Sequence, residues 1–415
     1  MKIALHPLLY LICVLTDFSA FIVIFSVSRG LAEVHAETWW LGIVGALFSF
    51  SAGVASIVSG LLSHRLDGRY VFVGGAAAIG MSVVGCGTLS VQSPWFLACY
   101  WLLGVGLGFL YPPLIGWLNQ GESAHTNRSG VSRTLIIYCV AWNVGMICGQ
   151  LTAGSLFRLG TAWVYGIASV IAFVNLLIAG MAIRRVVPLV VTSFAAPSIR
   201  SDSIDLAVAF KKLGWIANLG GMFGGSMVLH LLPDLAVKIG IDPSQHGTLL
   251  ACWRLAIIAT YFLMHRWHYW HYHFGTSVVS QCLAVIGLLV IACANSYITL
   301  LAGLVLLGQL IGYNYFSGLF YSTAGTSDKG RAFAAGVHEA TLATGMATGT
   351  VIGGVLGSQV DFRAPYVLAA IVLVLIIFVQ TVVWWKRARP LLRCAEHEET
   401  QQSLPVSPSI AETPK

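Results

Sequence analysis

Apolar residues occupy long uninterrupted stretches of this chain, and charged and turn-forming residues gather in the short segments between them. An α-helix of roughly 20 apolar residues is long enough to cross the ~30 Å hydrocarbon core of a bilayer. The pattern therefore predicts an all-α membrane protein. It predicts twelve transmembrane helices, near residues 5–28, 38–63, 70–90, 95–118, 133–156, 162–183, 213–232, 247–264, 275–294, 297–321, 332–356 and 364–385.

Composition indicates the same class of protein. Of the 415 residues, 57% are hydrophobic and 9% are charged, and the mean hydropathy is +0.81, whereas soluble proteins carry about 25% charged residues. So few charges cannot cover a water-facing surface, and the lipid bilayer is the expected environment. The nine cysteines are scattered singly without a Cys-x-x-Cys pair, so neither a disulfide framework nor a metal site is expected.

The basic residues indicate how the predicted spans are oriented. Twelve spans place both termini on one side, and Lys and Arg are enriched in cytoplasmic segments of membrane proteins. On this assignment 18 of the 23 Lys and Arg lie on the side of the termini, Arg254 lies within a span, and four lie opposite (Arg29, Arg158, Lys238, Arg363). We expect cytoplasmic termini in a plasma or cell inner membrane. The net charge of +7 is then a topology signal and not a sign of nucleic-acid binding.

The longest predicted connection divides the chain into two groups of six spans. The predicted parts are an N-terminal six-helix half over residues 1–183, a cytoplasmic loop over 184–212, a C-terminal six-helix half over 213–385 and a tail over 386–415. The tail is rich in Ser, Pro, Gln and Glu, a composition that cannot bury a core, and we expect it to be disordered and cytoplasmic.

An internal repeat relates the two halves. The pattern Leu-Leu-Gly-x-x-x-Gly-x-x-Tyr occurs at residues 102–111 in the fourth span and at 306–315 in the tenth, so Tyr111 corresponds to Tyr315 at an offset of 204 residues. Small residues at such spacing also serve simple tight packing of helices. A second, ordered match predicts pseudo-symmetric halves, a known transporter design with the substrate between them. That match consists of fifth-span and eleventh-span glycines at an offset of 200 residues: Gly145, Gly149 and Gly154, and Gly345, Gly349 and Gly354.

With these features the chain resembles the major facilitator superfamily over roughly residues 5–385. Residues 60–69, after the second span, are similar to the family's GxLaDrxGr loop, although His64 stands where the family has Asp. The fifth-span glycines resemble the family's GxxxGPxxGG motif, with Gln150 in place of Pro, and Tyr100 stands where many proton-coupled members carry a basic residue. The resemblance implies a cavity lined by spans one, four, seven and ten, and contacts between the halves through spans two, five, eight and eleven. It also implies a cytoplasmic gating loop, here Gly60, Arg65, Asp67, Gly68 and Arg69.

Ionisable residues are few within the predicted spans, and such residues usually face a cavity or a partner. Asp17 lies near the middle of the first span, where it forms either a proton, cation or amine site or a capped polar kink. Glu339, which follows His338, lies in the eleventh span and Arg254 in the eighth, so they are either substrate ligands or gating residues. Our hypothesis is that Asp17 and Glu339 govern coupling and that Arg254 contacts the substrate or gates its path.

Polar and aromatic side chains within the spans form a second group of candidates. Aromatic rings with a few placed polar groups suit a small organic ligand, and the alternative for several of them is helix packing or anchoring at the membrane interface. The candidates are Gln309, Tyr313, Asn314 and Tyr315 in the tenth span, together with Tyr111, Trp142, Asn143 and Asn218.

The expected function is alternating-access secondary transport of a small organic solute, with proton coupling favoured by the buried carboxyl groups. The alternative is a membrane receptor or sensor that keeps the transporter fold without turnover. The sequence contains no GxxxxGK[ST] motif and no catalytic constellation, and the His-rich residues 265–273 are typical of an interfacial aromatic belt. We expect no enzymatic activity, no cofactor and no metal. The expected partners of a monomeric chain are the solute, a proton or other ion, and lipid.

Overall fold

The computed structural model describes residues 5–90, 93–118, 128–185, 201–324 and 331–393. Every regular element within these ranges is helical. Twelve of the described segments are long and apolar enough to span a membrane, which confirms the predicted number of spans. The all-α membrane fold read from the sequence is therefore the fold of the protein.

The N-terminal half consists of six long helices. They are α1 (Leu5–Glu33), α2 (Thr38–Arg65), α3 (Gly68–Thr88), α4 (Pro94–Leu118), α5 (Arg128–Leu156), extended by η1 (Phe157–Leu159), and α6 (Thr161–Ala182).

The C-terminal half repeats this arrangement with more interruptions. Its elements are α7 (Ser201–Ser226), η2 (Met227–Leu231), α8 (Leu232–Lys238), α9 (Pro243–Arg266), η3 (His268–Trp270), α10 (Phe274–Ala292), α11 (Tyr297–Ala324), α12 (Arg331–Gln359), α13 (Ala364–Val383) and η5 (Trp384–Ala388). α7, η2 and α8 together form one continuous apolar span, Asp205–Lys238.

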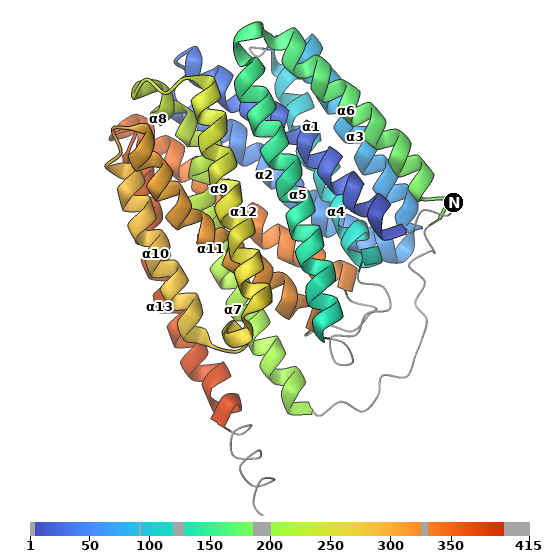
Figure 1. The fold of residues 1–415 in the computed structure, drawn as a ribbon, viewed down its shortest axis with the longest axis vertical. Coiled ribbons are helices and arrows are strands. Elements are labelled where there is room, and N and C mark those ends of the chain that lie inside the picture. The colour runs from blue at the N-terminus through green and yellow to red at the C-terminus, as the bar shows by residue number, and fades with distance from the viewer. Residues whose placement is uncertain (1–4, 91–92, 119–127, 186–200, 325–330, 394–415) are drawn as a thin grey trace, which may run out of the picture.

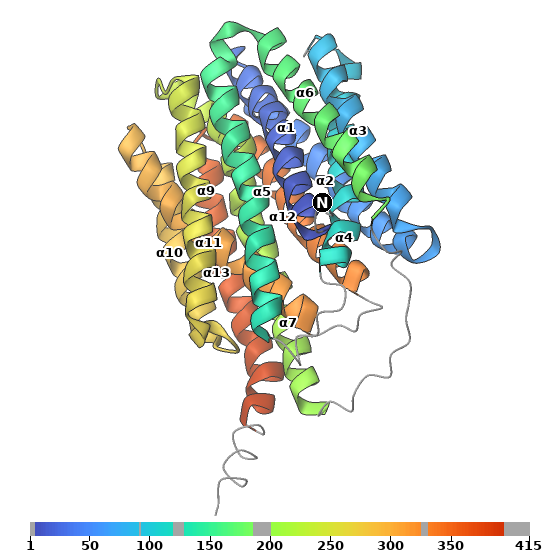
Figure 2. The ribbon, with the colours of Figure 1, turned by 45° about the vertical axis from the view of Figure 1, so that its right-hand side comes forward.

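The two halves lie side by side and meet through two helix pairs. α2 packs against α12, and α5 packs against α9. Figures 1 and 2 show α3 and α6 on one flank of the molecule and α10 on the opposite flank, away from this boundary. Side chains from the central helices of both halves can therefore reach the space between the halves.

The repeated glycines stand where helices come closest. A Cβ atom on Gly145 would lie 2.3 Å from the carbonyl oxygen of Val14 on α1, and one on Gly345 would lie 2.4 Å from the carbonyl oxygen of Leu219 on α7. Small residues permit this backbone contact between membrane helices. α5 thus packs on α1 as α12 packs on α7, so the repeat seen in the sequence corresponds to equivalent helix pairs.

The last glycine of each set lies at the boundary between the halves. A Cβ on Gly154 would lie 3.1 Å from the Cα of Gly247 on α9, and a Cβ on Gly354 would lie 2.9 Å from the Cα of Gly42 on α2. The middle pair, Gly149 and Gly349, approaches α1 and α7 one turn further along: a Cβ there would lie 2.7 Å from the Phe18 carbonyl oxygen and 2.5 Å from that of Phe223.

Hydrogen bonds join the halves at the end that carries the connection between α1 and α2. The Thr38 hydroxyl donates to Asp234 over 2.9 Å, and the Arg29 guanidinium donates to the backbone carbonyl of Ile241 over 2.9 Å. The backbone amide of Trp39 donates to the Ser358 hydroxyl over 2.8 Å. These bonds hold α1 and α2 against the C-terminal half at this end of the molecule.

A π-helical turn, η2, interrupts the seventh span, and the sequence analysis missed it. It turns the buried ring of His230 toward α2, where a Cβ on Gly45 would lie 2.5 Å from the His230 Cγ. His230 Nδ1 lies 3.5 Å from the Ser28 hydroxyl of α1. π-turns are frequent near functional sites, and this one adds a polar contact across the boundary.

Two predicted domain boundaries differ from the structure. α7 begins at Ser201, inside the loop predicted over 184–212. Helix continues from η5 to residue 393, past the predicted start of the tail at 386, and Trp384 stacks on Phe274 with ring centroids 5.4 Å apart. Residues 186–200 and 394–415, which hold the rest of these two segments, lie outside the described residues.

Candidate functional site

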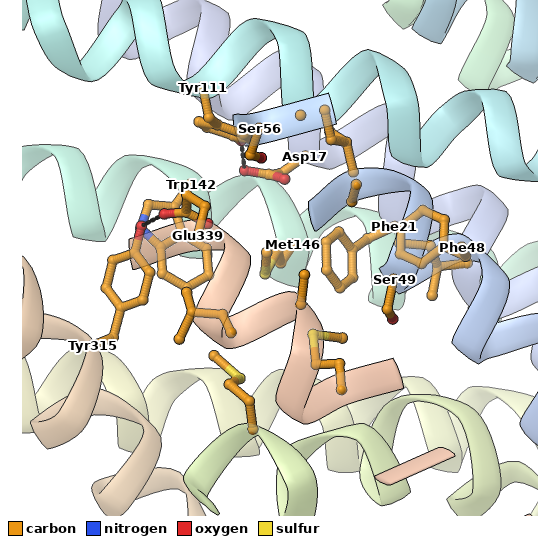
Figure 3. A pocket seen from close by; sticks show the side chains of 18 of the residues that line it. Asp17, Phe21, Phe48, Ser49, Ser56, Tyr111, Trp142, Met146, Tyr315 and Glu339 are labelled. Atoms are coloured by element: carbon orange, nitrogen blue, oxygen red, sulfur yellow. Dashed lines mark hydrogen bonds between the residues drawn. The ribbon is translucent and has the colours of Figure 1, made fainter. Parts of the chain in front are cut away.

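A cavity of about 160 Å³ lies between the two halves (Figure 3). An engineered cavity of about 150 Å³ admits a single benzene ring, so the space suits a small organic group. Residues of α1, α2, α4 and α5 line it from one half and residues of α7, α9, α11 and α12 from the other: Asp17, Phe21, Ile24, Phe48, Ser49, Ala52, Ser56, Leu107, Gly108, Tyr111, Tyr138, Trp142, Met146, Met222, Arg254, Tyr315, Glu339, Leu342, Ala343 and Met346.

The first carboxyl group of the cavity belongs to Asp17, whose side chain is 1% exposed. Its Oδ2 accepts a hydrogen bond from the hydroxyl of Tyr111 on α4 (Figure 3). The close approach of α5 at Gly145, whose Cβ would lie 3.0 Å from the Cβ of Asp17, fixes this part of α1. Asp17 therefore faces the cavity from a rigid helix pair.

The second carboxyl group belongs to Glu339 on α12. The hydroxyl of Tyr315 on α11 donates to Glu339 Oε1 over 3.0 Å. The hydroxyl oxygen of Tyr138 on α5 lies 3.3 Å from that of Tyr315, so a hydrogen bond joins the two halves at this point. Glu339 is thus linked through one tyrosine to the N-terminal half.

The two tyrosines that serve the carboxyl groups are the repeat-equivalent pair, Tyr111 and Tyr315. The carboxyl groups themselves are not equivalent, because at the 200-residue offset Cys139 corresponds to Glu339. The repeat therefore supplies an equivalent tyrosine hydroxyl in each half. The acids occupy non-equivalent helices, α1 in the N-terminal half and α12 in the C-terminal half.

Arg254 brings a positive charge to the same cavity. α9, which carries it, begins with a capping box in which Asp242 Oδ1 accepts from the Gln245 amide over 2.9 Å. The Arg254 side chain is 3% exposed, and its Cζ lies 4.2 Å from the ring centroid of Trp253 and 5.3 Å from that of Phe21. Among the described residues no carboxylate forms an ion pair with it, and its Nε has no hydrogen-bond partner.

The rest of the wall is apolar and aromatic. The Trp142 and Tyr315 rings pack with centroids 5.0 Å apart. Met146, Met222 and Met346 add flexible, polarisable side chains that adapt to different shapes. The cavity therefore combines two carboxyl groups and one guanidinium cation with a wall that suits an organic body.

Six of the twelve substrate or coupling candidates named from the sequence lie together in this cavity: Asp17, Tyr111, Trp142, Arg254, Tyr315 and Glu339. Spans two, five, eight and eleven contribute to the wall as well as spans one, four, seven and ten, because the helices that join the halves also border the space between them.

Gln309 and Tyr313 face away from the central cavity. They line a second cavity of about 940 Å³ beside α10, with the His-rich segment and Trp384. The Tyr313 hydroxyl lies 2.7 Å from the Thr276 hydroxyl, and Gln309 Oε1 accepts from Ser280 over 2.7 Å. These two candidates join α11 to α10 within the C-terminal half.

The remaining four candidates lie behind the cavity wall. The Asn314 amide donates to the Ala217 carbonyl over 2.8 Å and joins α11 to α7. The Asn143 amide donates to the Cys139 carbonyl over 2.8 Å and lies 3.4 Å from the Tyr261 hydroxyl across the boundary. Asn218 and His338 are buried beside Gly318, and their side-chain nitrogen and oxygen atoms have no hydrogen-bond partner among the described residues.

The predicted gating loop forms a tight local turn between α2 and α3. Asp67 caps α3 by accepting from the Arg69 backbone amide over 3.0 Å, and the Arg69 Nε donates to Asp67 Oδ2 over 2.6 Å. These hydrogen bonds lower the pKa of Asp67, so its carboxylate remains charged. Gly60 and Gly68 are buried, and the side chain of Arg65 lies outside the described residues.

Sequence reasoning missed Tyr138, which reaches across the boundary to Tyr315. A signal was present: Tyr138, Trp142 and Met146 recur at every fourth position and so share one face of α5. All three line the cavity. Phe48 and Met222 were also missed, because a single apolar residue in an apolar span carries no local mark of its orientation.

Comparison with solved structures finds similar folds. The human organic anion transporter MFSD10 (TETRAN) is 18% identical, with a TM-score of 0.67 over 91% of this chain and 98% of that one. A bacterial homologue of the human lysosomal transporter Spinster, in an inward-facing, unoccupied conformation, is 14% identical, with a TM-score of 0.64 over 94% of this chain and 97% of that one. No curated protein sequence matches the chain.

The family comparison covers nearly the whole chain in two overlapping matches. The model of the Major Facilitator Superfamily matches residues 8–267 and residues 214–411. The twelve apolar helices and the fold of the transporters above agree with that match. The chain is a multi-pass membrane protein of transporter type, and it belongs to the Major Facilitator Superfamily.

Proposed function

We propose that this protein is a secondary active transporter that moves a small organic solute together with protons. The observation that carries the proposal is that Asp17 and Glu339 face one cavity between the halves, each held by an equivalent tyrosine. Ionisable groups at membrane depth are costly and commonly mark the path of a substrate or proton. The cavity wall supports an organic solute because it is largely apolar and aromatic.

Transport requires the cavity to open to each side in turn, as the two halves rock against one another. The bonds from Arg29 and Thr38 to the C-terminal half must break when the end near the α1–α2 connection opens. The Tyr138–Tyr315–Glu339 hydrogen bonds join the halves within the cavity. Binding of a proton to Glu339 changes the carboxylate that accepts the last of these hydrogen bonds. Protonation is thereby connected to the movement of the halves.

The proposal includes the placement of the protein in the membrane. The excess of Lys and Arg on the side of the termini supports cytoplasmic termini in a plasma or cell inner membrane. The proposed working unit is a monomer, because residues of both halves of one chain line the central cavity. The family supports transport and not catalysis as the activity.

Proteoliposomes with a pH-sensitive dye inside test the proposal. Addition of a transported solute is expected to produce solute uptake together with a change of internal pH in wild-type vesicles. Asp17→Asn and Glu339→Gln are expected to remove the pH signal, because each replaces a group that can exchange a proton with one that cannot. Asp361→Asn is the matched control, because Asp361 is exposed and does not line the cavity.

Three outcomes would contradict parts of the proposal. Full uptake that still responds to the pH gradient in both cavity variants would exclude Asp17 and Glu339 as coupling groups. Solute uptake without any proton movement in the wild type would indicate a facilitator that is not coupled to protons. Binding of a solute without uptake or exchange would indicate a receptor that keeps the transporter fold.

A further inference from the structure

Arg254 has a buried charge without a matching partner. An arginine guanidinium stays protonated in proteins and carries five N–H donors but no acceptor. Arg254 is 3% exposed, its Nε has no hydrogen-bond partner, and no ion pair of the described residues involves it. A buried charge without a partner is strongly destabilising. The cavity therefore contains donors that are free for an anionic group.

The two acids of the cavity do not occupy these donors. Asp17 accepts from Tyr111, and Glu339 accepts from Tyr315. Asp17 lies close enough to interact electrostatically with Arg254, but the two form no ion pair. Each acid thus has a hydroxyl donor of its own, and the guanidinium has aromatic rings instead of an oxygen partner.

The surroundings of Arg254 indicate the rest of the ligand. The Cζ atom of Arg254 lies over the rings of Trp253 and Phe21. These rings do not replace the oxygen acceptors that a carboxylate would offer to the N–H groups of the guanidinium. Phe48, Trp142 and Met222 provide apolar wall in the same cavity. A volume of about 160 Å³ matches one ring-sized body.

We propose that the substrate is a small organic anion, with a carboxylate or similar oxyanion on Arg254 and a compact apolar or aromatic body against the Phe21, Phe48 and Trp142 rings. This assignment rests on the proposed transport function and names its substrate class. It differs from the sequence-based alternative of an amine bound at Asp17, which places a positive group in the same space.

The charges of the cavity then determine the direction of coupling. Five titratable groups line the cavity with Arg254: Asp17, Tyr111, Tyr138, Tyr315 and Glu339. Tyr261 on α9 also acts electrostatically on Arg254. When Asp17 and Glu339 are ionised, they repel an anionic substrate. When both are protonated, the positive charge of Arg254 is the net charge of these three groups. The anion and the proton therefore bind together and cross in the same direction.

Thermal unfolding of the purified full chain with three ring-sized probes tests the substrate class. Benzoate, benzamide and benzylamine share a similar size and differ in charge. A ligand that binds the folded state raises the melting temperature. We expect benzoate to raise it more than benzamide or benzylamine does, and to do so more strongly at mildly acidic than at neutral pH.

Variants of Arg254 locate the bound anion. Arg254→Gln is expected to weaken benzoate binding roughly 10- to 100-fold, the usual effect of losing a charge-assisted hydrogen-bonded pair. Arg254→Lys keeps the positive charge but loses the planar set of donors. Its affinity for benzoate is expected to lie between those of the wild type and Arg254→Gln. Arg363→Gln is the control, since Arg363 bonds to Ala292 and Asn295 outside the cavity.

Equal stabilisation by benzamide, or stronger stabilisation by benzylamine, would overturn the assignment, and so would the absence of any effect of benzoate. The probe comparison needs no variant, so it decides the matter even when Arg254→Gln does not fold. Transport of cations or neutral solutes with proton movement would leave the proposed function standing and exclude the anion. Anion binding without uptake would keep the assignment of the ligand class and exclude the proposed transport function.

Discussion

The hydroxyl oxygens of Tyr138 and Tyr315 lie 3.3 Å apart across the boundary between the two halves. Tyr315 also donates to Glu339, so a change at this acid reaches the N-terminal half through two hydrogen bonds. Rocking of the halves must stretch or break the contact between the tyrosines. This pair is therefore the point at which protonation and conformation meet in the proposed mechanism.

The first prediction separates the two roles of this pair. Tyr315→Phe removes the donor to Glu339 as well as the contact between the halves, whereas Tyr138→Phe removes only the contact. We expect slower uptake in both variants. Only in Tyr315→Phe do we expect the pH of half-maximal uptake to move upward, because the ionised acid has lost a hydrogen bond that favours it.

Proteoliposome uptake measured over a range of pH checks this prediction. Tyr366→Phe serves as a control, because Tyr366 is a buried tyrosine that does not line the cavity and whose hydroxyl has no hydrogen-bond partner in the described part of the chain. An identical shift in both cavity variants would show that the effect arises from the contact and not from Glu339.

The second prediction concerns the helix contact that positions Asp17. An alanine Cβ at position 145 would lie 2.3 Å from the Val14 carbonyl oxygen, so Gly145→Ala must push α5 away from α1. Overpacking of this kind costs about 1–3 kcal/mol. We expect a lower melting temperature and reduced uptake, and the equivalent Gly345→Ala should act in the same way on α12 and α7.

Gly166→Ala provides the matched comparison, because no atom of the described residues outside this helix turn lies within 4 Å of a Cβ at that position of α6. Stability is expected to be unchanged or slightly higher there, since alanine favours a helix more than glycine does. Equal losses at positions 145 and 166 would show that the close approach to α1 is not the cause.

The third prediction addresses the hydrogen bonds at the end near the α1–α2 connection. Thr38→Val removes the bond to Asp234, a change worth about 0.5–1.5 kcal/mol, or roughly a 2- to 10-fold shift of an equilibrium. We expect the population of molecules open at this end to rise by that factor. Thr88→Val, which removes only exposed hydrogen bonds to the Val84 and Gly85 carbonyls within α3, is the control.

Spin-label distances measure this shift. Val34 and Val360 are exposed residues of opposite halves at this end, and cysteines at these two positions can carry labels once the nine native cysteines are replaced. A longer distance component should gain weight in Thr38→Val. An unchanged distribution would mean that the Thr38 bond does not contribute to closure.

The fourth prediction follows from the position of Tyr313, two residues before Tyr315 on the same helix. Its hydroxyl bonds to Thr276 beside the second cavity. Tyr313→Phe is therefore expected to cost about 0.5–1.5 kcal/mol of stability and to leave the KM for solute unchanged. A raised KM would place Tyr313 on the substrate path, contrary to the structure.

The sequence alone determined the spans, the two halves and the equivalence of Tyr111 with Tyr315. These properties are local or periodic: a membrane helix must be apolar over its whole length, and repeated motifs keep their spacing whatever their contacts are. The burial of Asp17 and Arg254 followed in the same way, because each lies inside an apolar run.

The tertiary structure decided which face of each helix meets the cavity. Side chains two residues apart on a helix point about 200° apart around its axis. Tyr313 and Tyr315 therefore face different cavities although both are tyrosines in one span. The contact of Tyr138 with Tyr315 and the free donors of Arg254 depend on how two bundles pack together, and residues far apart in the chain set that packing. Hydropathy gives the depth of a side chain in the membrane, whereas only the helix contacts give its direction.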